Sequence, residues 1–305
     1  MTEAAFLAVD WGTTNLRAWV LDRGGGILAG RDFPLGVSRI GAGEAQRCFD
    51  ETVRPALKAE GLPAVLCGMV GSNLGWVEVP YVDCPADLNA LGRRLLRIEG
   101  ESPPVLIVPG LRARRPDGEP DVMRGEEVQV LGWIAEATER RRGRRLVCHP
   151  GTHAKWVRVE DGRIEHFVTA MTGELFDLLR KHSVLPVRDG PDDDEAFDDG
   201  VRAAGDGEAL AARLFTARSR VVGAGMPAAR VRSYLSGLLI GAEVAATPAL
   251  AGADPGEPVA LIGDLRLCGL YRRALQARGV ETSVHDGDDA VLTGLKALFE
   301  AERVT

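Results

Sequence analysis

The chain has 305 residues and a formal net charge of −7; 45% of its residues are hydrophobic and 27% are charged. This length suffices for two domains with a sizeable core, and the acidic balance argues against nucleic acid or a membrane surface as a general partner. No apolar run approaches the ~20 residues of a membrane-spanning helix, and Met1–Ala5 lacks the basic start of a signal peptide. We therefore expect a cytoplasmic protein. Its five cysteines are scattered without metal-binding spacing, which predicts buried thiols.

The first elements of the chain surround a turn that is typical of phosphate binding. Strands are predicted over Phe6–Val9, Leu16–Leu21 and Ile27–Phe33. Between the first two lies Asp10-Trp11-Gly12-Thr13-Thr14-Asn15, a carboxylate at a strand end followed by a glycine and two hydroxyl residues. Backbone N–H groups of such a turn can face an anion, and Asp10 can reach the metal ion that accompanies a phosphate. An ordinary hairpin corner is the alternative interpretation of this turn.

The next candidate site follows a buried strand predicted over Ala64–Val70. This strand runs into the polar turn Gly71–Trp76, and open α/β sheets bind ligands at the carboxyl ends of their strands. Ser72, Asn73 and Trp76 are therefore candidates for substrate contacts, unless the turn is a plain loop. Around this turn we expect a helix over Glu44–Ala59 that Pro55 interrupts, a helix over Asp87–Ile98, a strand over Val105–Val108 and a charged loop through Pro120.

A candidate general base lies near the start of the following helix, which is predicted from Asp121 through about Ala137. Glu126 lies beside Arg124, at a helix N-terminus that favours an anionic side chain and fixes its direction. A base that accepts a proton from an attacking hydroxyl needs that rigidity. The alternative is that Glu126 and Glu127 only complement the helix dipole.

A second copy of the first turn begins at His149, in the string HPGTHAKWV. Gly151-Thr152 matches Gly12-Thr13, and strands are predicted before and after it, over Leu146–Cys148, Lys155–Val159 and Ile164–Val168. His153 and Lys155 lie in or beside this turn; Lys155 is either a point charge for a phosphate or an exposed strand residue. Two such turns at the heads of two half-chains indicate two similar subdomains that face each other across a nucleotide.

The rest of the second half alternates helices and strands. We predict that the segment Thr169–Leu175 leads into a helix that ends at Ser183, followed by an acidic surface segment over Asp192–Asp199 with helices on either side. Five further elements follow: Val231–Ala246 (helix), Val259–Ile262 (strand), Leu267–Ala277 (helix), Thr282–His285 (strand) and Asp288–Ala301 (helix). Each half begins with consecutive strands and continues with alternating helices and strands. This order predicts an α/β protein with mixed sheets in both halves. The sequence holds no GxxxxGK[ST] motif and no GxGxxG motif after its first strand, which argues against a Walker-type P-loop and a nicotinamide enzyme.

The two turns resemble those of the actin, Hsp70 and sugar-kinase superfamily, and the resemblance becomes closer with six strings in order: DWGTTNLRAW, CGMVGSNLGW, MRGEEVQVLG, HPGTHAKWV, MTGEL and LSGLLIGAEV. Together they look like the 2-dehydro-3-deoxygalactonokinase family. The resemblance implies two actin-like (ribonuclease H-like) subdomains, which we place at residues 1–144 and 145–305, with a nucleotide cleft between them. It also implies transfer of the ATP γ-phosphate to the 6-hydroxyl of 2-dehydro-3-deoxy-D-galactonate.

The same resemblance assigns roles to the candidate residues. Asp10 would organise Mg²⁺, and Glu126 is our candidate base. Ser72, Asn73 and Trp76 would shape the sugar-acid pocket, with Arg17 or Arg124 available for charge. The nucleotide would contact both turns, and its adenosine would lie near the segment Ile262–Arg266. The residues expected to contact it are Gly12, Thr13, Thr14, Asn15, Gly151, Thr152, His153, Lys155 and Gly263. Asp264 and Arg266 replace small residues that are usual in the family, which leaves the adenosine contacts open.

Two alternatives to this function remain. The nearest is a kinase for another small sugar acid or ketose, and the more distant is a nucleotide-dependent switch protein on the same fold. We expect a small-molecule acceptor and ATP as partners, with a homodimer as one possible assembly.

Overall fold

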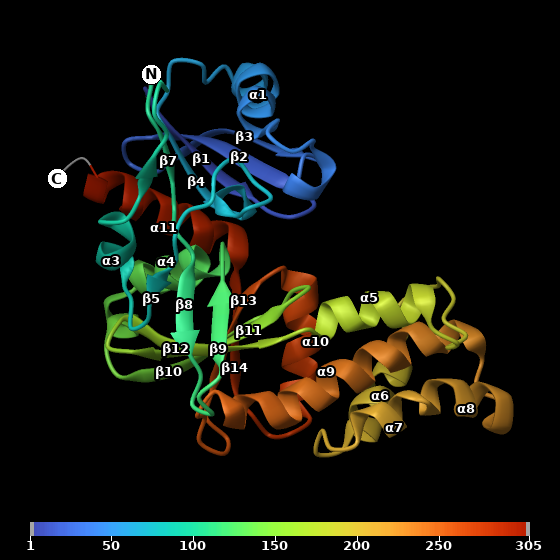
Figure 1. Ribbon diagram of the computed structural model, residues 1–305. Coiled ribbons are helices and arrows are strands. Elements are labelled where there is room, and N and C mark those ends of the chain that lie inside the picture. The colour runs from blue at the N-terminus through green and yellow to red at the C-terminus, as the bar shows by residue number, and fades with distance from the viewer. Residues whose placement is uncertain (1–2, 303–305) are drawn as a thin grey trace.

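The computed structural model describes residues 3–302, and its first half is built on a six-stranded mixed sheet (Figure 1). β1 (Ala4–Trp11) pairs antiparallel with β2 (Leu16–Asp22) and parallel with β4 (Ala64–Gly68). The order is β3-β2-β1-β4-β7-β6, in which the other strands are β3 (Ile27–Phe33), β7 (Val105–Ile107) and β6 (Leu96–Arg97). The three opening strands are therefore confirmed.

Side chains of β1 alternate between two cores because successive residues of a strand point to opposite faces. Leu7 and Val9 pack in one cluster with Phe49, which lies in the helical segment after β3. Phe6 and Ala8 pack in another cluster with residues of α4 (Glu126–Glu136) and α11 (Gly287–Glu302). Both faces of the sheet are thus covered, as a strand that is buried along most of its length requires.

The second half repeats this arrangement. Its five-stranded sheet has the order β12-β11-β10-β13-β14, with an antiparallel meander followed by parallel strands, like the order of the first sheet. Its strands are β10 (Arg144–His149), β11 (Ala154–Glu160), β12 (Arg163–Ala170), β13 (Val259–Gly263) and β14 (Thr282–Asp286). The fold class predicted from the repeat is confirmed.

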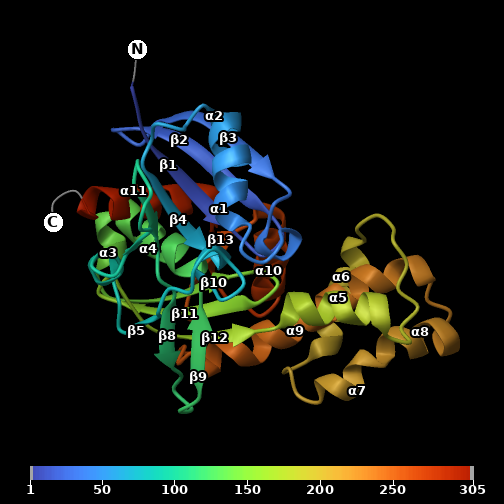
Figure 2. The same cartoon turned by 45° about the horizontal axis from the view of Figure 1, so that its top comes forward.

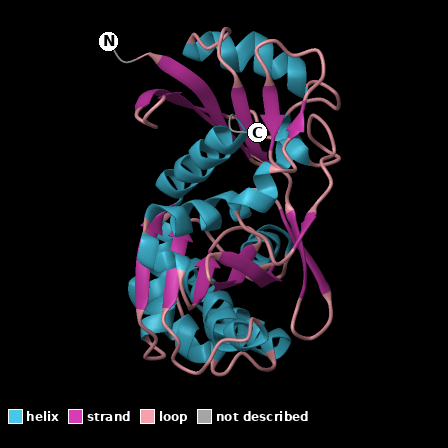
Figure 3. Cartoon of the chain, turned by 90° about the vertical axis from the view of Figure 1, so that its left-hand side faces the viewer, coloured by secondary structure: helices cyan, strands magenta, loops and turns pink. Residues whose placement is uncertain are grey.

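Helices α4 and α11 lie between the two sheets (Figures 1 and 3). They cross at a very short distance, which only glycine allows at the crossing. A Cβ atom on Gly132 would lie 2.0 Å from the carbonyl oxygen of Ala290, and one on Gly294 would lie 2.4 Å from that of Val128. The final helix therefore returns to pack against elements of the first half. The boundary at residues 144 and 145 stays a prediction; one sheet lies on each side of it.

A group of helices projects from the second sheet (Figures 1 and 2). It comprises α5 (Thr172–His182), α6 (Asp194–Ala204), α7 (Leu210–Leu214), α8 (Thr216–Ala224) and α9 (Val231–Leu250), while α10 (Leu265–Gln276) follows β13. The stretch Ala228–Leu250 is long and apolar enough to cross a membrane, but 67% of its most apolar window is buried inside the protein. This burial is that of a core helix.

Four local predictions differ from the structure. The helix predicted over Asp87–Ile98 is only α3 (Leu88–Gly92), because Leu96 pairs with Ile107 in the sheet. The charged loop before Pro120 is a hairpin of β8 (Leu111–Arg114) and β9 (Pro120–Met123), which joins β5 (Val82–Asp83) in a small third sheet. The helix predicted from Asp121 begins at Glu126, since Asp121 is part of β9. The acidic segment after Asp192 is the start of α6, which the side chain of Asp193 caps by accepting from Ala196 N at 2.8 Å.

The helix expected over Glu44–Ala59 forms as one run with a change of pitch. It consists of α1 (Ala45–Cys48), wider π-type turns over Phe49–Val53, and α2 (Arg54–Leu57). Pro55 lies in the first turn of α2, where a missing N–H is tolerated. Of the five cysteines, Cys67, Cys148 and Cys268 are buried, and Cys48 and Cys84 are partly buried; all five are free thiols.

Candidate active site

The first turn, Gly12–Asn15, is held by the segment Leu35–Ser38. Gly36 N and Ser38 N donate to the carbonyls of Thr14 and Thr13 at 3.1 and 3.0 Å. Glycine is required in this segment because a Cβ on Gly36 would lie 2.1 Å from the carbonyl carbon of Thr14. Among residues 3–302, the N–H groups of Thr13 and Thr14 donate to no protein group, so they remain available for an anion.

Asp10 is the last residue but one of β1, beside this turn, and its side chain is 13% exposed. Its Oδ2 accepts a hydrogen bond from Arg17 Nη2 at 2.6 Å. The other terminal nitrogen of Arg17 pairs with Asp288, at the start of α11. Burial raises the pKa of Asp288, and the charge of Arg17 opposes that rise. Arg17 thus links the first strand pair to the last helix.

The second turn, Gly151–His153, is held by the start of α5. A Cβ on Gly173 would lie 2.5 Å from the carbonyl oxygen of Gly151, and Glu174 N donates to the carbonyl of Thr152 at 3.0 Å. The ring of His153 pairs with the carboxylate of Glu174. The start of α5 therefore supports the second turn, as the segment Leu35–Ser38 supports the first.

At the strand end where the first copy carries Asp10, the second copy carries His149. Its Nε2 lies 2.9 Å from Gln129 Oε1, and burial lowers the pKa of its imidazole. The second turn thus begins with a neutral ring in place of a carboxylate. The two halves, though similar in fold, are chemically different at this position.

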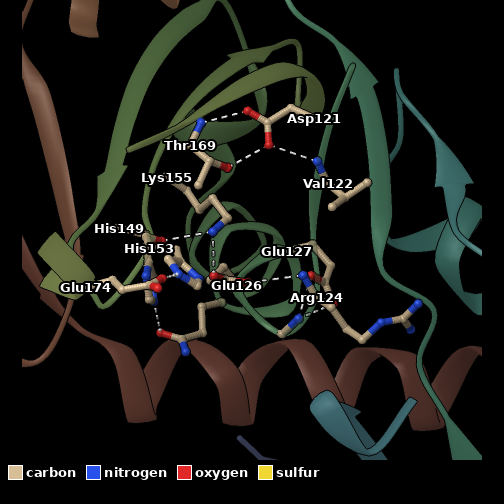
Figure 4. A network of polar contacts seen from close by, with 12 residues as sticks. Asp121, Val122, Arg124, Glu126, Glu127, His149, His153, Lys155, Thr169 and Glu174 are labelled. Carbon is tan, nitrogen blue, oxygen red and sulfur yellow. Dashed lines mark hydrogen bonds and ion pairs between the residues drawn. The ribbon is translucent and has the colours of Figure 1, made fainter. Parts of the chain in front are cut away.

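Glu126, the first residue of α4, is held on both carboxylate oxygens (Figure 4). Its Oε1 lies 3.0 Å from Lys155 Nζ, and its Oε2 accepts from the backbone N–H of Arg124 at 3.1 Å. Lys155 comes from β11 of the second half, is 3% exposed and also donates to the carbonyl of His153 at 2.9 Å. Burial opposes the charge of Glu126, but the positive charge of Lys155, together with His149 and the hydrogen bonds to the carboxylate, holds the pKa of this carboxyl below its ordinary value.

Glu127 has a different environment. It is fully buried, and both of its oxygens accept from the backbone N–H of Gly125, at 2.9 and 2.7 Å. Burial, together with the neighbouring charge of Glu126, raises the pKa of Glu127 to about 8. Glu127 therefore caps its own helix, whereas Glu126 faces open space.

That open space consists of two cavities that share residues. A cavity of 770 Å³ is lined by both turns, Asp10, Arg124 and Glu126. A cavity of 700 Å³ lies on the second half, between α5, α6, α9 and the start of α10. Both are lined by Arg17, Gln129, His149, Gly151 and Thr152. The second turn therefore lies where the cavities join, and both turns line the 770 Å³ cavity.

The segment after β13 lies beside the 700 Å³ cavity, and its charged residues have structural partners. Gly263 has a φ of +143° and lines the cavity. Asp264 caps α10 by accepting from Leu267 N at 2.8 Å, and Arg266 pairs with Asp192 at 3.3 Å. Apolar side chains contribute to the wall: Phe176, Phe197, Leu239, Ile240 and Leu270. A flat apolar group fits between such side chains, with polar groups at the rim.

The residues expected to shape a sugar-acid pocket lie elsewhere. Ser72 is 8% exposed and donates from Oγ to the carbonyl of Met69 at 2.7 Å, within its own turn. Trp76 packs against Phe49 with ring centroids 5.7 Å apart, and Asn73 is exposed. Neither cavity lining includes any of the three. The hydrogen bond of Ser72 and the packing of Trp76 fix the shape of the loop.

Arg124 does line the 770 Å³ cavity, although it is 8% exposed. Its Nη2 donates to the carbonyl of Val79 at 2.7 Å, and its guanidinium lies 4.4 Å from the ring centroid of Tyr81. The cavity also includes residues to which the sequence analysis gave no role: Asp32, Phe33, Pro34, Gly68, Met69 and Gln129. Phe33 and Gly68 are the last residues of strands β3 and β4. Because ligands bind at the carboxyl ends of strands in open α/β sheets, both residues could have been predicted from the strand ends.

The chain is similar to known proteins along nearly its whole length. The sequence profile described as 2-keto-3-deoxy-galactonokinase matches residues 10–298. A Rhizobium meliloti (strain 1021) protein named "Probable 2-dehydro-3-deoxygalactonokinase DgoK1" is 39% identical over 306 residues, and the 2-dehydro-3-deoxygalactonokinase of Escherichia coli (strain K12) is 36% identical over 300; each alignment covers 98% of both chains.

Solved structures show the same relation at the level of the fold. A crystal structure of a related protein from Sinorhizobium meliloti superposes with a TM-score of 0.87 at 38% identity, covering 97% of this chain and 98% of that one. The activator of the 2-hydroxyisocaproyl-CoA dehydratase from Clostridium difficile, solved with bound ADPNP, has a TM-score of 0.51 at 13% identity, covering 98% of this chain and 96% of that one, and shares the fold alone. The chain belongs to the 2-keto-3-deoxy-galactonokinase family.

Proposed function

We propose that this protein transfers the γ-phosphate of ATP to the 6-hydroxyl of 2-dehydro-3-deoxy-D-galactonate, giving the 6-phospho sugar acid and ADP in galactonate catabolism. One observation carries the proposal: in a chain of this kinase family, two turns from opposite halves line one cavity beside a fixed carboxylate, and the second turn also lines an adjoining cavity. Phosphoryl transfer relies mainly on positioning and charge stabilisation, and this geometry supplies both.

In this proposal the nucleotide spans the junction. Its adenosine occupies the 700 Å³ cavity, where apolar side chains and Gly263 line the wall. Its phosphates reach Gly151 and Thr152, and the γ-phosphate faces the free N–H groups of Thr13 and Thr14. Asn15 and His153, at the ends of the two turns, line the 770 Å³ cavity.

The site also fits Mg²⁺, through Asp10. Mg²⁺ prefers oxygen ligands and is often bound by one or two carboxylates together with substrate phosphates. Asp10 offers a carboxylate at the cavity wall, whose charge Arg17 compensates in the free protein. Bound there, the ion would neutralise charge on the phosphates. Arg17 lines both cavities and adds a positive charge to the same region.

Glu126 is the proposed base for the 6-hydroxyl proton. Its contacts with Lys155 and Arg124 N hold the carboxylate at a fixed angle and keep it ionised at neutral pH. A weak base suffices here, because the hydroxyl becomes acidic as its oxygen bonds to phosphorus. Lys155 is thereby assigned to Glu126 rather than to a phosphate, since it does not line the cavity.

The sugar acid is proposed to occupy the part of the 770 Å³ cavity on the first half. Arg124 contributes positive charge to this part, and Asp32 and the ends of β3 and β4 form its wall. Ser72, Asn73 and Trp76 act on this pocket only through the shape of the Met69–Trp76 loop. A cytoplasmic location and a homodimer belong to the same proposal.

A coupled assay of ADP release tests this function. With ATP and Mg²⁺, turnover should require 2-dehydro-3-deoxy-D-galactonate and should be negligible without an acceptor. Other 2-keto-3-deoxy acids and ketoses in the same panel test the nearest alternative, a kinase for a different sugar. Rapid hydrolysis of ATP that the sugar acids leave unchanged would contradict the proposal and favour a nucleotide-dependent switch.

A further inference from the structure

A carboxylate that the proposed mechanism does not use is buried in the second half. Glu243 lies in α9 and is 5% exposed. One oxygen accepts from the indole Nε1 of Trp156 at 2.7 Å, and the other accepts from the hydroxyl of Tyr271 at 2.7 Å. Burial raises the pKa of Glu243, and the polar groups of Thr172, Tyr271 and Trp156 oppose that rise. The carboxyl group is thus surrounded by neutral donors.

These donors come from separate elements of the second half. Trp156 lies on β11, Tyr271 on α10, and Thr172 is the first residue of α5. Trp156 and Tyr271 are 0% and 1% exposed. Moving any of these elements away from α9 would leave a buried donor or a buried carboxylate unpaired, which costs more free energy than a hydrogen bond normally contributes. Glu243 therefore fixes the spacing of these elements.

One of them continues directly into the second turn. Gly173 follows Thr172, and its backbone lies so close to the turn that a Cβ atom would be 2.8 Å from Thr152 Cα. Glu174 N donates to the carbonyl of Thr152 at 3.0 Å. Thr172, Gly173 and Tyr271 also line the 700 Å³ cavity together with the turn. A displacement of the first turn of α5 would consequently displace Gly151 and Thr152.

We propose that Glu243 is a positioning residue for the nucleotide. It locks the first turn of α5, and through it Gly151–Thr152, in the geometry that binds phosphates. This inference rests on the proposed function, because it takes the 700 Å³ cavity as the nucleotide site. Loss of the carboxylate weakens the binding of ATP and leaves the sugar-acid site unchanged, since the first half supplies that site.

Three variants separate the role of the carboxylate from that of its bulk. Glu243→Leu leaves the donors unpaired. Glu243→Gln keeps most of the network, because its amide oxygen accepts from Trp156 and its NH₂ group donates to the hydroxyl of Tyr271, which can also accept. Tyr271→Phe removes one donor with almost no change of volume and keeps the test valid if Glu243→Leu does not fold.

Glu257 provides a matched control, because its partner lies on the same strand as Trp156. Its carboxylate pairs with Arg158, two residues beyond Trp156 on β11, with Nη1 and Oε1 2.5 Å apart. Neither Glu257 nor Arg158 lines either cavity. Glu257→Leu therefore removes a buried partner of β11 without touching α5, and it should lower stability while leaving the affinity for ATP unchanged.

The experiment measures the dissociation constant of ATP by calorimetry, both KM values, and hydrogen exchange of the Glu174 amide without ligand, at a temperature where every variant is folded. We expect Glu243→Leu to weaken ATP binding about tenfold, the scale of one or two lost buried hydrogen bonds. Tyr271→Phe should give a smaller loss, Glu243→Gln should stay near wild type, and the KM for the sugar acid should not change.

Two results would overturn the inference: an unchanged ATP affinity in both Glu243→Leu and Tyr271→Phe, or an equal loss in Glu257→Leu. Wild-type protein that binds no ATP would instead refute the proposed function. Hydrogen exchange then still tests the positioning role, because the Glu174 amide should exchange faster in Glu243→Leu than in Glu257→Leu. Equal exchange in the two variants would refute that role.

Discussion

At the scale of residues, the two adjacent glutamates at the start of α4 have opposite environments, one ionised beside a lysine and one buried with a raised pKa. Their place at a helix start predicted a carboxylate with a fixed direction, but both residues satisfy that description. Successive side chains of a helix point about 100° apart, so one of them faces Lys155 and the cavity while the other turns back to Gly125 N. The partner that decides between them lies 29 residues later in the chain, where no local pattern reveals it.

The first prediction tests Glu126 as the base. Glu126→Gln should lower kcat by ~10²–10⁴-fold, the usual range for a general base, with little change in either KM, because the amide keeps the volume but cannot accept the proton. Steady-state kinetics with both substrates varied provide the measurement. Glu127→Gln serves as the control and should keep most of kcat. An inactive Glu127→Gln with an active Glu126→Gln would move the base by one residue, and two active variants would leave only the helix-dipole role.

The second prediction concerns the pH dependence of stability. The folded protein holds the proton of Glu127 up to a pKa of about 8, whereas the unfolded chain releases it at the ordinary, lower pKa of a glutamate. Between those values the native state binds more protons, so this residue makes the free energy of unfolding fall as pH rises. Glu127→Gln removes that term and should raise Tm by several degrees at pH 8 and by much less at pH 5. Thermal melts across this range check it, and an equal shift at both pH values would contradict it.

At the scale of elements, regular strands and helices with a clear apolar pattern were predictable, and the site turns were predictable because they repeat. The hairpin of β8 and β9 was missed because its arginines made it look like a loop. Its alternation is nevertheless present, since Leu111 and Ala113 are buried while Arg112 and Arg114 are exposed. The hydrogen bonds from the segment Leu35–Ser38 to the first turn could not be foreseen from composition.

The third prediction tests that support of the first turn. Gly36→Ala should distort the turn, because its Cβ would lie 2.1 Å from the carbonyl carbon of Thr14. The free N–H groups of Thr13 and Thr14 would then point away from the γ-phosphate, and kcat should fall by about tenfold or more, as small misplacements of reacting groups do. Gly61→Ala is the control in the same half, since its Cβ would meet nothing within 4 Å. Wild-type kcat in Gly36→Ala would show that the turn does not depend on this segment.

At the scale of the whole molecule, the repeat predicted two similar halves, and the two sheets have matching strand orders. How the halves meet was not predictable. Lys155 reaches Glu126 across them, and Asp121 on β9 accepts from Thr169 N and Oγ1 on β12, each at 2.7 Å (Figure 4). Contacts between distant segments leave no periodic signal in either segment. The placement of α11 against α4 also depends on contacts between distant segments, and it brings Asp288 to Arg17.

The last prediction uses two helical glycines that should respond with opposite signs. Gly132 lies where α4 crosses α11, and a Cβ there would be 2.0 Å from the carbonyl oxygen of Ala290, so Gly132→Ala must push the helices apart. Because α4 begins with Glu126 and α11 begins beside Asp288, the variant should lower Tm by many degrees and impair turnover together. Gly269 in α10 has nothing within 4 Å of its Cβ position, so Gly269→Ala should gain the helix propensity of alanine, about 0.5–1 kcal/mol. Denaturant titrations of both variants measure the signs; a Gly132→Ala protein as stable as wild type would mean that the two halves do not depend on this crossing.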